Sequence, residues 1–224
     1  MPHPAEDLTR AAYDLVADVY ADHVPSTEPE QPIELAMIEH FVSLLPEPRR
    51  VLDAGCGAGR MLPHLAALGC MPEGIDLSPQ MVRRARQDHP GHPVRVGSLT
   101  ELPWGDEEFD GVFAWYSTIH SPDEVLDVIV GELRRVLRRG GCLLVAWQVG
   151  TGVRQVGEGF RALGYDVTMR RYHRTLATMV EQVTRHDLDV VSHLERGPVA
   201  GESDPQAVLI ARRRTTRCPA RAPP

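Results

Sequence analysis

Residues 51–60 read Val51-Leu52-Asp53-Ala54-Gly55-Cys56-Gly57-Ala58-Gly59-Arg60, and this stretch decides the fold. An apolar run ends in three glycines that alternate with small residues. The apolar residues that follow have helical spacing: Met61, Leu62, Leu65 and Leu68. The stretch therefore predicts a strand, a tight glycine turn and a helix. Glycine has no Cβ, so a ligand can lie directly on such a turn, where the first N–H groups of the helix also point.

The glycine spacing narrows the class of ligand. Dinucleotide-binding turns carry G-x-G-x-x-G with an acidic residue about 20 positions later, whereas here the order is G-x-G-x-G, with Asp53 just before it. Asp76 lies near the end of the stretch over 71–77, which predicts a second strand, and a carboxylate there can accept both hydroxyls of a ribose. The alternative is an ordinary strand-to-helix turn whose glycines serve packing only.

Together, the glycine turn and Asp76 make the chain resemble the class I S-adenosylmethionine-dependent methyltransferases, in particular the group that acts on small molecules. Residues 51–60 match the first motif of that family, Asp76 matches its ribose-binding acid, and further matches extend from Ala11 to Trp147. The resemblance implies an α/β fold. This would be a three-layer, Rossmann-like sandwich with a seven-stranded, mostly parallel sheet, an antiparallel last strand and N-terminal lid helices.

The resemblance also implies S-adenosyl-L-methionine as cofactor and methyl donor. Its binding residues, carried over position by position, are Tyr13, Tyr20, Asp53, Ala54, Gly55, Cys56, Gly57, Arg60, Asp76, Leu77, Met81, Ser98, Leu99, Ala114 and Trp115. In the family an N-terminal helix folds over the cofactor, so Tyr20 is expected near the sulfonium and Tyr13 as a second wall. Leu77 and Met81 match the residues that flank the adenine. The alternatives are two half-buried aromatics that attach the helix to the core, and a Met81 that is only a core residue.

One position departs from the family pattern. The family usually has Gly-Asp after its third strand, and that Asp accepts a hydrogen bond from the adenine amine; this chain has Gly97 and Ser98. A neutral hydroxyl is a weaker acceptor than a carboxylate, so we expect a weaker contact with adenine at Ser98. The N–H of Leu99 is expected to meet adenine N1.

Methyl transfer from a sulfonium is an in-line displacement, so the enzyme must mainly hold an acceptor about 3 Å from the methyl group, dry and aligned. Tyr116 and His120 follow the predicted strand over 109–115, beyond the end where ligands bind in open α/β sheets. Together with Tyr20 they are the predicted catalytic residues. His120 is the leading candidate for a base if the acceptor must lose a proton; the alternative is a capping or solvent-exposed histidine. His173 is a weaker candidate.

Hydrophobic spacing and turn residues predict the remaining elements. Helices are expected over 8–23, 33–45, 61–68, 79–88, 123–138 and 175–186. Further strands are expected over 93–96, 109–115, 142–149, 188–194 and 207–211. Arg139-Gly140-Gly141 is expected to end the fifth helix. Residues 151–159 are expected to be a mobile glycine-rich stretch, and 167–173 an exposed strand or loop.

The length of 224 residues favours one domain. It is expected to span 1–212, with lid helices over 1–48, the cofactor-binding core over 49–149, and an acceptor-side segment with the last two strands over 150–212. Residues 213–224 are basic and contain proline, which predicts a disordered tail.

Composition argues against several classes of protein. The net charge of −7 argues against nucleic-acid binding, no apolar run approaches the roughly 20 residues of a membrane helix, and the N-terminus lacks the regions of a signal peptide. The 4 cysteines are scattered without C-x-x-C spacing, so neither a disulfide framework nor a zinc site is expected. The prediction is a cytoplasmic protein that needs no metal.

These observations predict a methyltransferase that moves a methyl group from S-adenosyl-L-methionine to an O, N or C atom of a small metabolite, as a monomer or homodimer. An alternative is a non-catalytic S-adenosylmethionine-binding protein that acts through a protein partner. An enzyme needs an acceptor cavity beside Tyr116 and His120, whereas such a sensor can have that space filled. A nicotinamide dehydrogenase is disfavoured by the glycine spacing.

Overall fold

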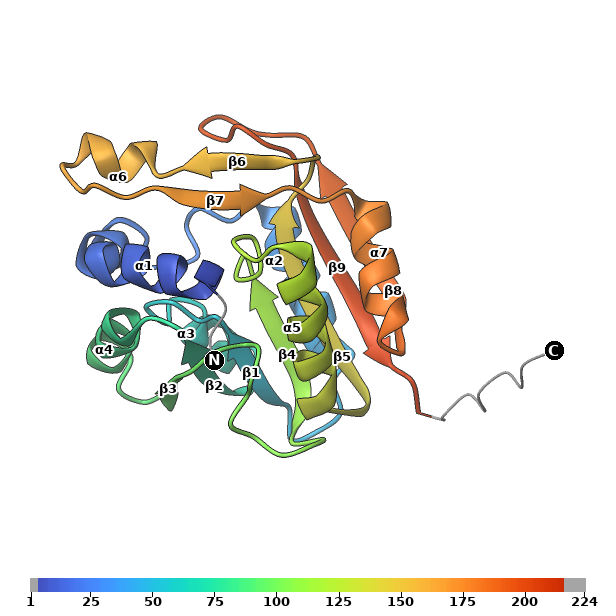
Figure 1. Ribbon diagram of the computed structural model, residues 1–224. Helices are drawn as coiled ribbons and strands as arrows, with labels where there is room; N and C mark the ends of the chain where they lie inside the picture. Colours follow the sequence, from blue (N-terminus) through green and yellow to red (C-terminus); the bar gives the residue numbers. More distant parts are fainter. Residues whose placement is uncertain (1–3, 216–224) are drawn as a thin grey trace.

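A computed structural model describes residues 4–215 of the chain (Figure 1). The helices are α1 (Pro4–His23), α2 (Pro32–Ser43), α3 (Leu62–Ala67), α4 (Pro79–Asp88), α5 (Asp123–Val136), α6 (Glu158–Ala162) and α7 (Leu176–Arg185). The strands are β1 (Arg50–Ala54), β2 (Met71–Asp76), β3 (Val94–Val96), β4 (Phe109–Trp115), β5 (Leu137–Gln148), β6 (Val153–Val156), β7 (Met169–Tyr172), β8 (Leu188–Arg196) and β9 (Gln206–Arg213). No helix in this described part is long and apolar enough to cross a membrane.

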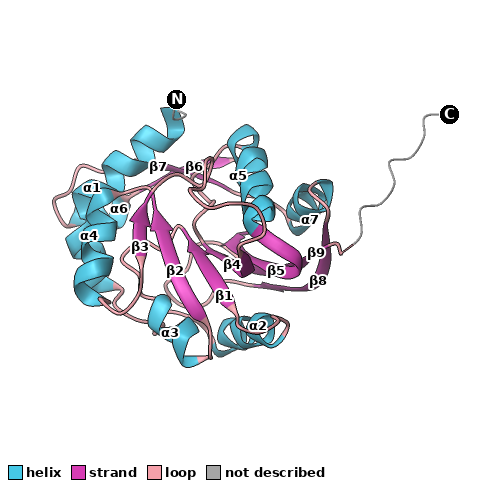
Figure 2. Cartoon of the chain, turned by 90° about the horizontal axis from the view of Figure 1, so that it is seen from below, coloured by secondary structure: helices cyan, strands magenta, loops and turns pink. Residues whose placement is uncertain are grey.

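The large sheet has the order β3-β2-β1-β4-β5-β9-β8. Strands β1 to β5 are parallel, and β9 runs antiparallel to both β5 and β8. Helices cover both faces (Figure 2): α2 and α3 pack against one face, and α5 and α7 against the other. Strand β4 is buried along its whole length, as expected for a central strand covered on both sides. The predicted three-layer sandwich is confirmed, including its seven strands and the antiparallel last strand.

The glycine turn and the start of α4 form as their sequences predict. The turn joins β1 to α3 with positive φ at Gly55, Gly57 and Gly59. Ser78 caps α4, because its hydroxyl accepts the Met81 N–H at 3.1 Å and a proline follows at the first helical position.

The predicted boundary between the fifth helix and the fifth strand was wrong. Helix α5 ends at Val136, and residues 137–141 already belong to β5. Leu137 pairs with Phe109, and the register shifts before Gly111 pairs with Cys142. Gly140 adopts a φ of +76° at this irregularity. Pairing with β4 therefore determines the conformation of a segment whose local sequence resembles a helix end.

The segment after β5 is more ordered than its glycine content suggests. Strands β6 and β7 pair antiparallel in a separate two-stranded sheet, with α6 in the connection between them. A strand within 167–173 is confirmed as β7, but its predicted exposure is wrong at Val167 and Met169, which are buried against α1. We call β6, α6 and β7 together the β6–β7 hairpin; it lies along α1, away from the large sheet (Figure 1).

The last strand extends further than expected. Strand β9 reaches Arg213, whose side chain is 5% exposed and bonds Glu107 at 2.8 Å. Arg213 therefore belongs to the folded domain and not to the predicted tail over 213–224. Residues 216–224 lie outside the described part of the chain, so the predicted tail and the other domain boundaries stay predictions.

Two glycine substitutions should change stability in opposite directions. A Cβ at Gly111 in β4 would lie 2.8 Å from Phe41 Cζ and from Leu45 Cδ1, so Gly111→Ala should lower the free energy of unfolding by about 1–3 kcal/mol through overpacking. Gly131 lies inside α5, where the nearest atom to an added Cβ is 3.5 Å away, so Gly131→Ala should raise it by about 0.5–1 kcal/mol. Urea unfolding measures both, and a Gly111→Ala protein as stable as the wild type would contradict the packing described here.

Candidate active site

A cavity of about 380 Å³ lies at the carboxyl ends of β1, β2 and β4. Helix α1 and the β6–β7 hairpin cover it, since α1 lies between the ends of these strands and the hairpin (Figure 1). Most of the predicted site residues line it: Tyr13, Tyr20, Asp53, Gly55, Cys56, Gly57, Arg60, Asp76, Leu77, Met81, Leu99, Trp115, Tyr116 and His120. The fold therefore brings together residues from the first helix, three strands and the loop after β4.

The glycines of the turn differ in what surrounds them. A Cβ at Gly55 would lie 2.3 Å from Ser117 Cβ, and one at Gly59 would lie 3.1 Å from Ala85, so these two glycines allow close packing. A Cβ at Gly57 would meet no atom within 4 Å. Gly57 lines the cavity, so its bare main chain faces open space that a ligand can fill.

Asp76 joins the end of β2 to the glycine turn. Its Oδ2 accepts the Gly57 N–H at 2.8 Å and its Oδ1 accepts the Ser78 N–H at 2.8 Å. Burial raises the pKa of Asp76 to about 6, although both of these hydrogen bonds act in the opposite direction. Each carboxylate oxygen has two lone pairs, so Asp76 can still accept hydrogen bonds from a ligand in the cavity.

Asp53 is a buried acceptor without a partner. The residue is 2% exposed, and its Oδ2 has no hydrogen bond from any residue of the described part of the chain. Burial raises its pKa to about 7, while Arg60 lowers it and Asp76 raises it further. Two other cavity-lining oxygens, Ser117 Oγ and Gln148 Oε1, also lack partners within residues 4–215. Unsatisfied acceptors at a cavity wall indicate a ligand that carries hydrogen-bond donors.

Arg60 lines the cavity in a buried ion pair with Glu30, a residue that sequence reasoning missed. Their side chains are 2.6 Å apart, and Glu30 also accepts the Trp115 indole N–H at 3.1 Å. Glu30 lies in the proline-containing loop between α1 and α2, where nothing in the local sequence distinguishes it from the other acidic residues. This pair fixes the loop beside the glycine turn.

His120 is a buried histidine whose tautomer follows from its partners. Its Nδ1 lies 2.6 Å from the Arg170 carbonyl oxygen, which can only accept, so Nδ1 carries the proton. Its Nε2 then accepts from the Tyr13 hydroxyl at 3.1 Å. Burial lowers the pKa of His120 to about 4, so the ring is neutral at pH 7 and is a weaker base than an exposed histidine. A capping or solvent-exposed role is not what the structure shows.

Tyr116 lines the cavity, while its hydroxyl is directed away to Glu34 at 3.3 Å. Burial raises its pKa, and Glu34 raises it further. Tyr116 has a φ of +56°, a costly conformation for a non-glycine residue that is often found at functional sites. The Tyr20 ring also borders the cavity and meets Tyr13 edge-on, with ring centres 6.1 Å apart.

Three predicted cofactor residues and the weaker base candidate lie away from the cavity wall. Ala54 and Ala114 are fully buried in the core of the sheet. Ser98 does not line the cavity, and its hydroxyl bonds the Glu6 carboxylate and Thr100. His173 is buried beside Asp204 at 3.3 Å and does not line the cavity.

The wall also contains residues that were not predicted: Glu6, Thr9, Arg10, Ser117, Gln148, Val156, Phe160, Met169 and Arg171. Most belong to α1 and the β6–β7 hairpin, which reach the cavity by tertiary packing that local sequence does not reveal. Within residues 4–215, no three His, Cys, Asp or Glu side chains are grouped so that they could hold a metal ion.

Comparison with known proteins agrees with this geometry. A family model described as a methyltransferase domain matches residues 51–141. The chain is 29% identical over 123 residues to a malonyl-[acyl-carrier protein] O-methyltransferase of Erwinia pyrifoliae, a match that covers 55% of this chain and 46% of that protein. It is 38% identical over 104 residues to the methyltransferase GfsG of Streptomyces halstedii, covering 43% of this chain and 37% of that protein. The chain thus spans less than half the length of these two relatives.

Among solved structures, the 1,6-didemethyltoxoflavin-N1-methyltransferase of Burkholderia thailandensis has the same fold. Its TM-score is 0.72 at 18% identity, and the match covers 96% of this chain and 92% of that one. The motifs, the strand order and these likenesses agree: residues 51–141 match a methyltransferase domain, and the chain has the fold of the S-adenosylmethionine-dependent methyltransferases.

Proposed function

We propose that this protein transfers a methyl group from S-adenosyl-L-methionine to an O, N or C atom of a small metabolite. The observation that carries the proposal is one cavity that is lined both by Gly57 and Asp76 and by Tyr116 and His120. A cofactor on the glycine turn and a second small molecule can therefore share it. Two of the proteins named above are methyltransferases for malonyl-[acyl-carrier protein] and for 1,6-didemethyltoxoflavin, which supports the reaction class.

The residues present fit the cofactor. In this proposal the ribose hydroxyls bond Asp76, and the adenine lies between Leu77 and Leu99. The methionine part lies on Gly57, with its ammonium group on the unpartnered Asp53 oxygen. A cation beside Asp53 would also offset the burial that raises its pKa.

The cofactor supplies an electrophilic methyl group. The chain binds the two reactants, aligns them and shields them from water. Burial under α1 and the β6–β7 hairpin excludes water, and Tyr20 and Tyr116 border the space in which the acceptor would lie. Where the acceptor loses a proton, His120 Nε2 is the nitrogen able to take it. Tyr13 donates to that nitrogen, so its hydroxyl carries the proton from the acceptor to the ring. No metal is needed for these steps.

The same cavity favours an enzyme over a sensor that acts through a protein partner. A sensor needs no space for a second small molecule. Here the cavity is also lined by Ser121, Met169 and Arg171, none of which the proposal assigns to the cofactor.

Cofactor binding tests the proposal directly. Calorimetric titration with S-adenosylmethionine and S-adenosylhomocysteine should give binding in the micromolar range or tighter, and Asp76→Ala should weaken it at least tenfold because two ribose hydroxyls lose a charged acceptor. Asp166→Ala makes the same change at an exposed site outside the cavity and should have no effect. Thermal melting separates lost affinity from lost folding, since Asp76 also accepts two backbone N–H groups. Absence of binding at millimolar ligand would overturn the proposal.

Affinity for the cofactor should rise with pH. Burial raises the pKa of Asp76 to about 6 and of Asp53 to about 7, and both bind the cofactor as carboxylates in this proposal. Binding then releases protons, so affinity should increase by at most about tenfold per pH unit for each group and level off above about pH 8. Calorimetry in two buffers of different ionisation enthalpy measures the released protons.

The unliganded protein should show the opposite dependence. A raised carboxyl pKa means that the folded state holds protons that the unfolded state releases. The contribution of Asp53 and Asp76 to the free energy of unfolding therefore falls as the pH rises from about 4 to about 7. Urea unfolding of the unliganded protein across this pH range measures that contribution.

For the affinity prediction, a cofactor Kd that stays constant between about pH 5.5 and 8 would contradict the assignment of both carboxylates.

His120 should affect transfer but not cofactor binding. Incubating cell-extract fractions with methyl-labelled S-adenosylmethionine identifies an acceptor by a gain of one labelled methyl group. With an acceptor that loses a proton, His120→Asn should lower kcat by about 10²–10⁴-fold while the Kd for the cofactor stays within about twofold. His193→Asn, at an exposed position on β8, is the matched control. Equal transfer rates for His120→Asn and the wild type would remove His120 from the mechanism.

A further inference from the structure

Three carboxylates line the described cavity, and they follow one another across the edge of the sheet. Asp53 lies near the end of β1 and Asp76 ends β2. The third, Glu6, belongs to α1, but its carboxylate accepts from the hydroxyl of Ser98, which closely follows β3. Strands β1, β2 and β3 are consecutive neighbours, and Asp76 is in register with Val96. Asp53 pairs with Gly74, two residues before Asp76, so the three carboxylates follow one another from β1 to β2 and to the loop after β3.

The cofactor carries hydrogen-bond donors in a matching covalent order. Its ammonium group stands at one end, the ribose hydroxyls in the middle and the adenine amine at the other end. With the ammonium at Asp53 and the ribose at Asp76, as in the proposed function, the next donor along the molecule is the adenine amine. The next carboxylate along the sheet edge is Glu6.

We infer that Glu6 is the adenine-recognition residue of this protein and that it accepts the exocyclic amine of the cofactor. This inference rests on the proposed function. The Glu6 side chain is held in place, since the Ser98 hydroxyl donates to its Oε1 and Thr100 Oγ1 lies 3.4 Å from the same oxygen. A carboxylate has about four acceptor positions, so Glu6 can accept the amine beside other donors. The neutral hydroxyl of Ser98 then orients the acceptor and is not itself the acceptor.

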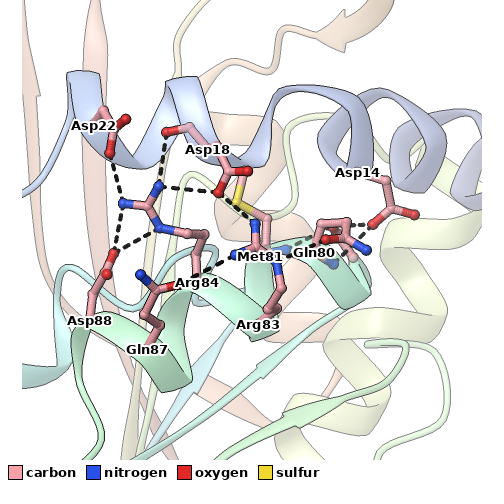
Figure 3. Close-up of polar contacts among 10 residues, drawn as sticks. Asp14, Asp18, Asp22, Gln80, Met81, Arg83, Arg84, Gln87 and Asp88 are labelled. Atoms are coloured by element: carbon pink, nitrogen blue, oxygen red, sulfur yellow. Dashed lines mark hydrogen bonds and ion pairs between the residues drawn. The ribbon is translucent and has the colours of Figure 1, made fainter.

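The position of Glu6 on α1 links adenine recognition to the covering of the cavity. Helix α1 is fastened along α4 by side chains shown in Figure 3. Arg84 on α4 bonds Asp18 at 3.1 Å and Asp22 at 2.8 Å, and the capping residue Ser78 bonds Asp14 at 2.6 Å. Asp14, Asp18 and Asp22 hold the middle and the end of α1 against α4. A bond from the adenine to Glu6 would add a contact at the first turn of the same helix.

The test compares two ligands that differ at C6 and N1 of the purine ring, so the diagnostic result is the change that a Glu6 substitution makes in their relative affinity. S-inosylhomocysteine has a carbonyl in place of the adenine amine of S-adenosylhomocysteine, so it presents an acceptor where Glu6 needs a donor. Calorimetry on the full chain should show that the wild type binds S-adenosylhomocysteine at least tenfold more tightly. Glu6→Gln should weaken S-adenosylhomocysteine by about tenfold and tighten S-inosylhomocysteine, because the amide N–H can donate to the carbonyl. Glu39→Gln, at an exposed position on α2, should leave both affinities unchanged.

The outcomes are distinct. If Glu6→Gln changes the two affinities equally, Glu6 supports only the fold and the inference fails. If the wild type does not discriminate between the ligands, it fails as well. If the wild type binds neither ligand, the proposed function itself fails.

Should Glu6→Gln not fold, as judged by its melting transition, Ser98→Ala provides the test: it removes the Ser98 hydroxyl bond that orients Glu6, together with the bonds of that hydroxyl to Thr100. It should weaken S-adenosylhomocysteine severalfold and leave S-inosylhomocysteine unchanged, and any other result overturns the inference.

Discussion

The structure depends on the hydrogen bond between the Gly57 N–H and the Asp76 carboxylate. This bond of 2.8 Å joins the turn after β1 to the end of β2, and the second oxygen of Asp76 accepts the Ser78 N–H at the start of α4. One side chain therefore sets the relative positions of two strand ends and a helix. Because the bond uses the main chain of Gly57, it leaves the open side of the turn bare, and the cavity begins there. The raised pKa of Asp76 is a consequence of the same burial.

The polar side chains that line the cavity differ in whether the protein itself supplies their partners. Arg60 and Glu30 neutralise each other, and Tyr116 directs its hydroxyl to Glu34. Asp53, in contrast, stays buried with an oxygen that no residue in the described part of the chain satisfies. A buried acceptor without a partner costs about 1–3 kcal/mol, a cost that a bound cation removes. The unliganded protein is thus strained at the point where the methionine end of the cofactor is proposed to bind.

Local sequence was sufficient for the features that depend on local interactions. The glycine turn, Asp76 at the end of a strand, the mostly apolar β4 and the Ser78 cap all follow from residues that are close together in the sequence. Local sequence was insufficient where distant pairing decides. Residues 137–141 are a strand because they pair with β4, and residues 153–156 are a strand because they pair with β7. Likewise, Glu6 and Glu30 are ordinary surface acids in the sequence and become cavity residues only when α1 and the loop after it fold over the sheet.

Two hydrogen bonds that join the β6–β7 hairpin to the loop after β4 use main-chain atoms of the hairpin. The Arg170 carbonyl oxygen accepts from His120 Nδ1, and the Tyr172 N–H donates to the Ile119 carbonyl oxygen at 2.8 Å. These anchors are available to almost any amino acid at positions 170 and 172. The hairpin also shares no ladder with the seven-stranded sheet. Cavity-lining side chains of the hairpin such as Val156 and Phe160 can therefore be changed while these two bonds, the glycine turn and Asp76 stay intact. Chemical diversity among such enzymes can arise from replacement of one short insertion, without redesign of the core.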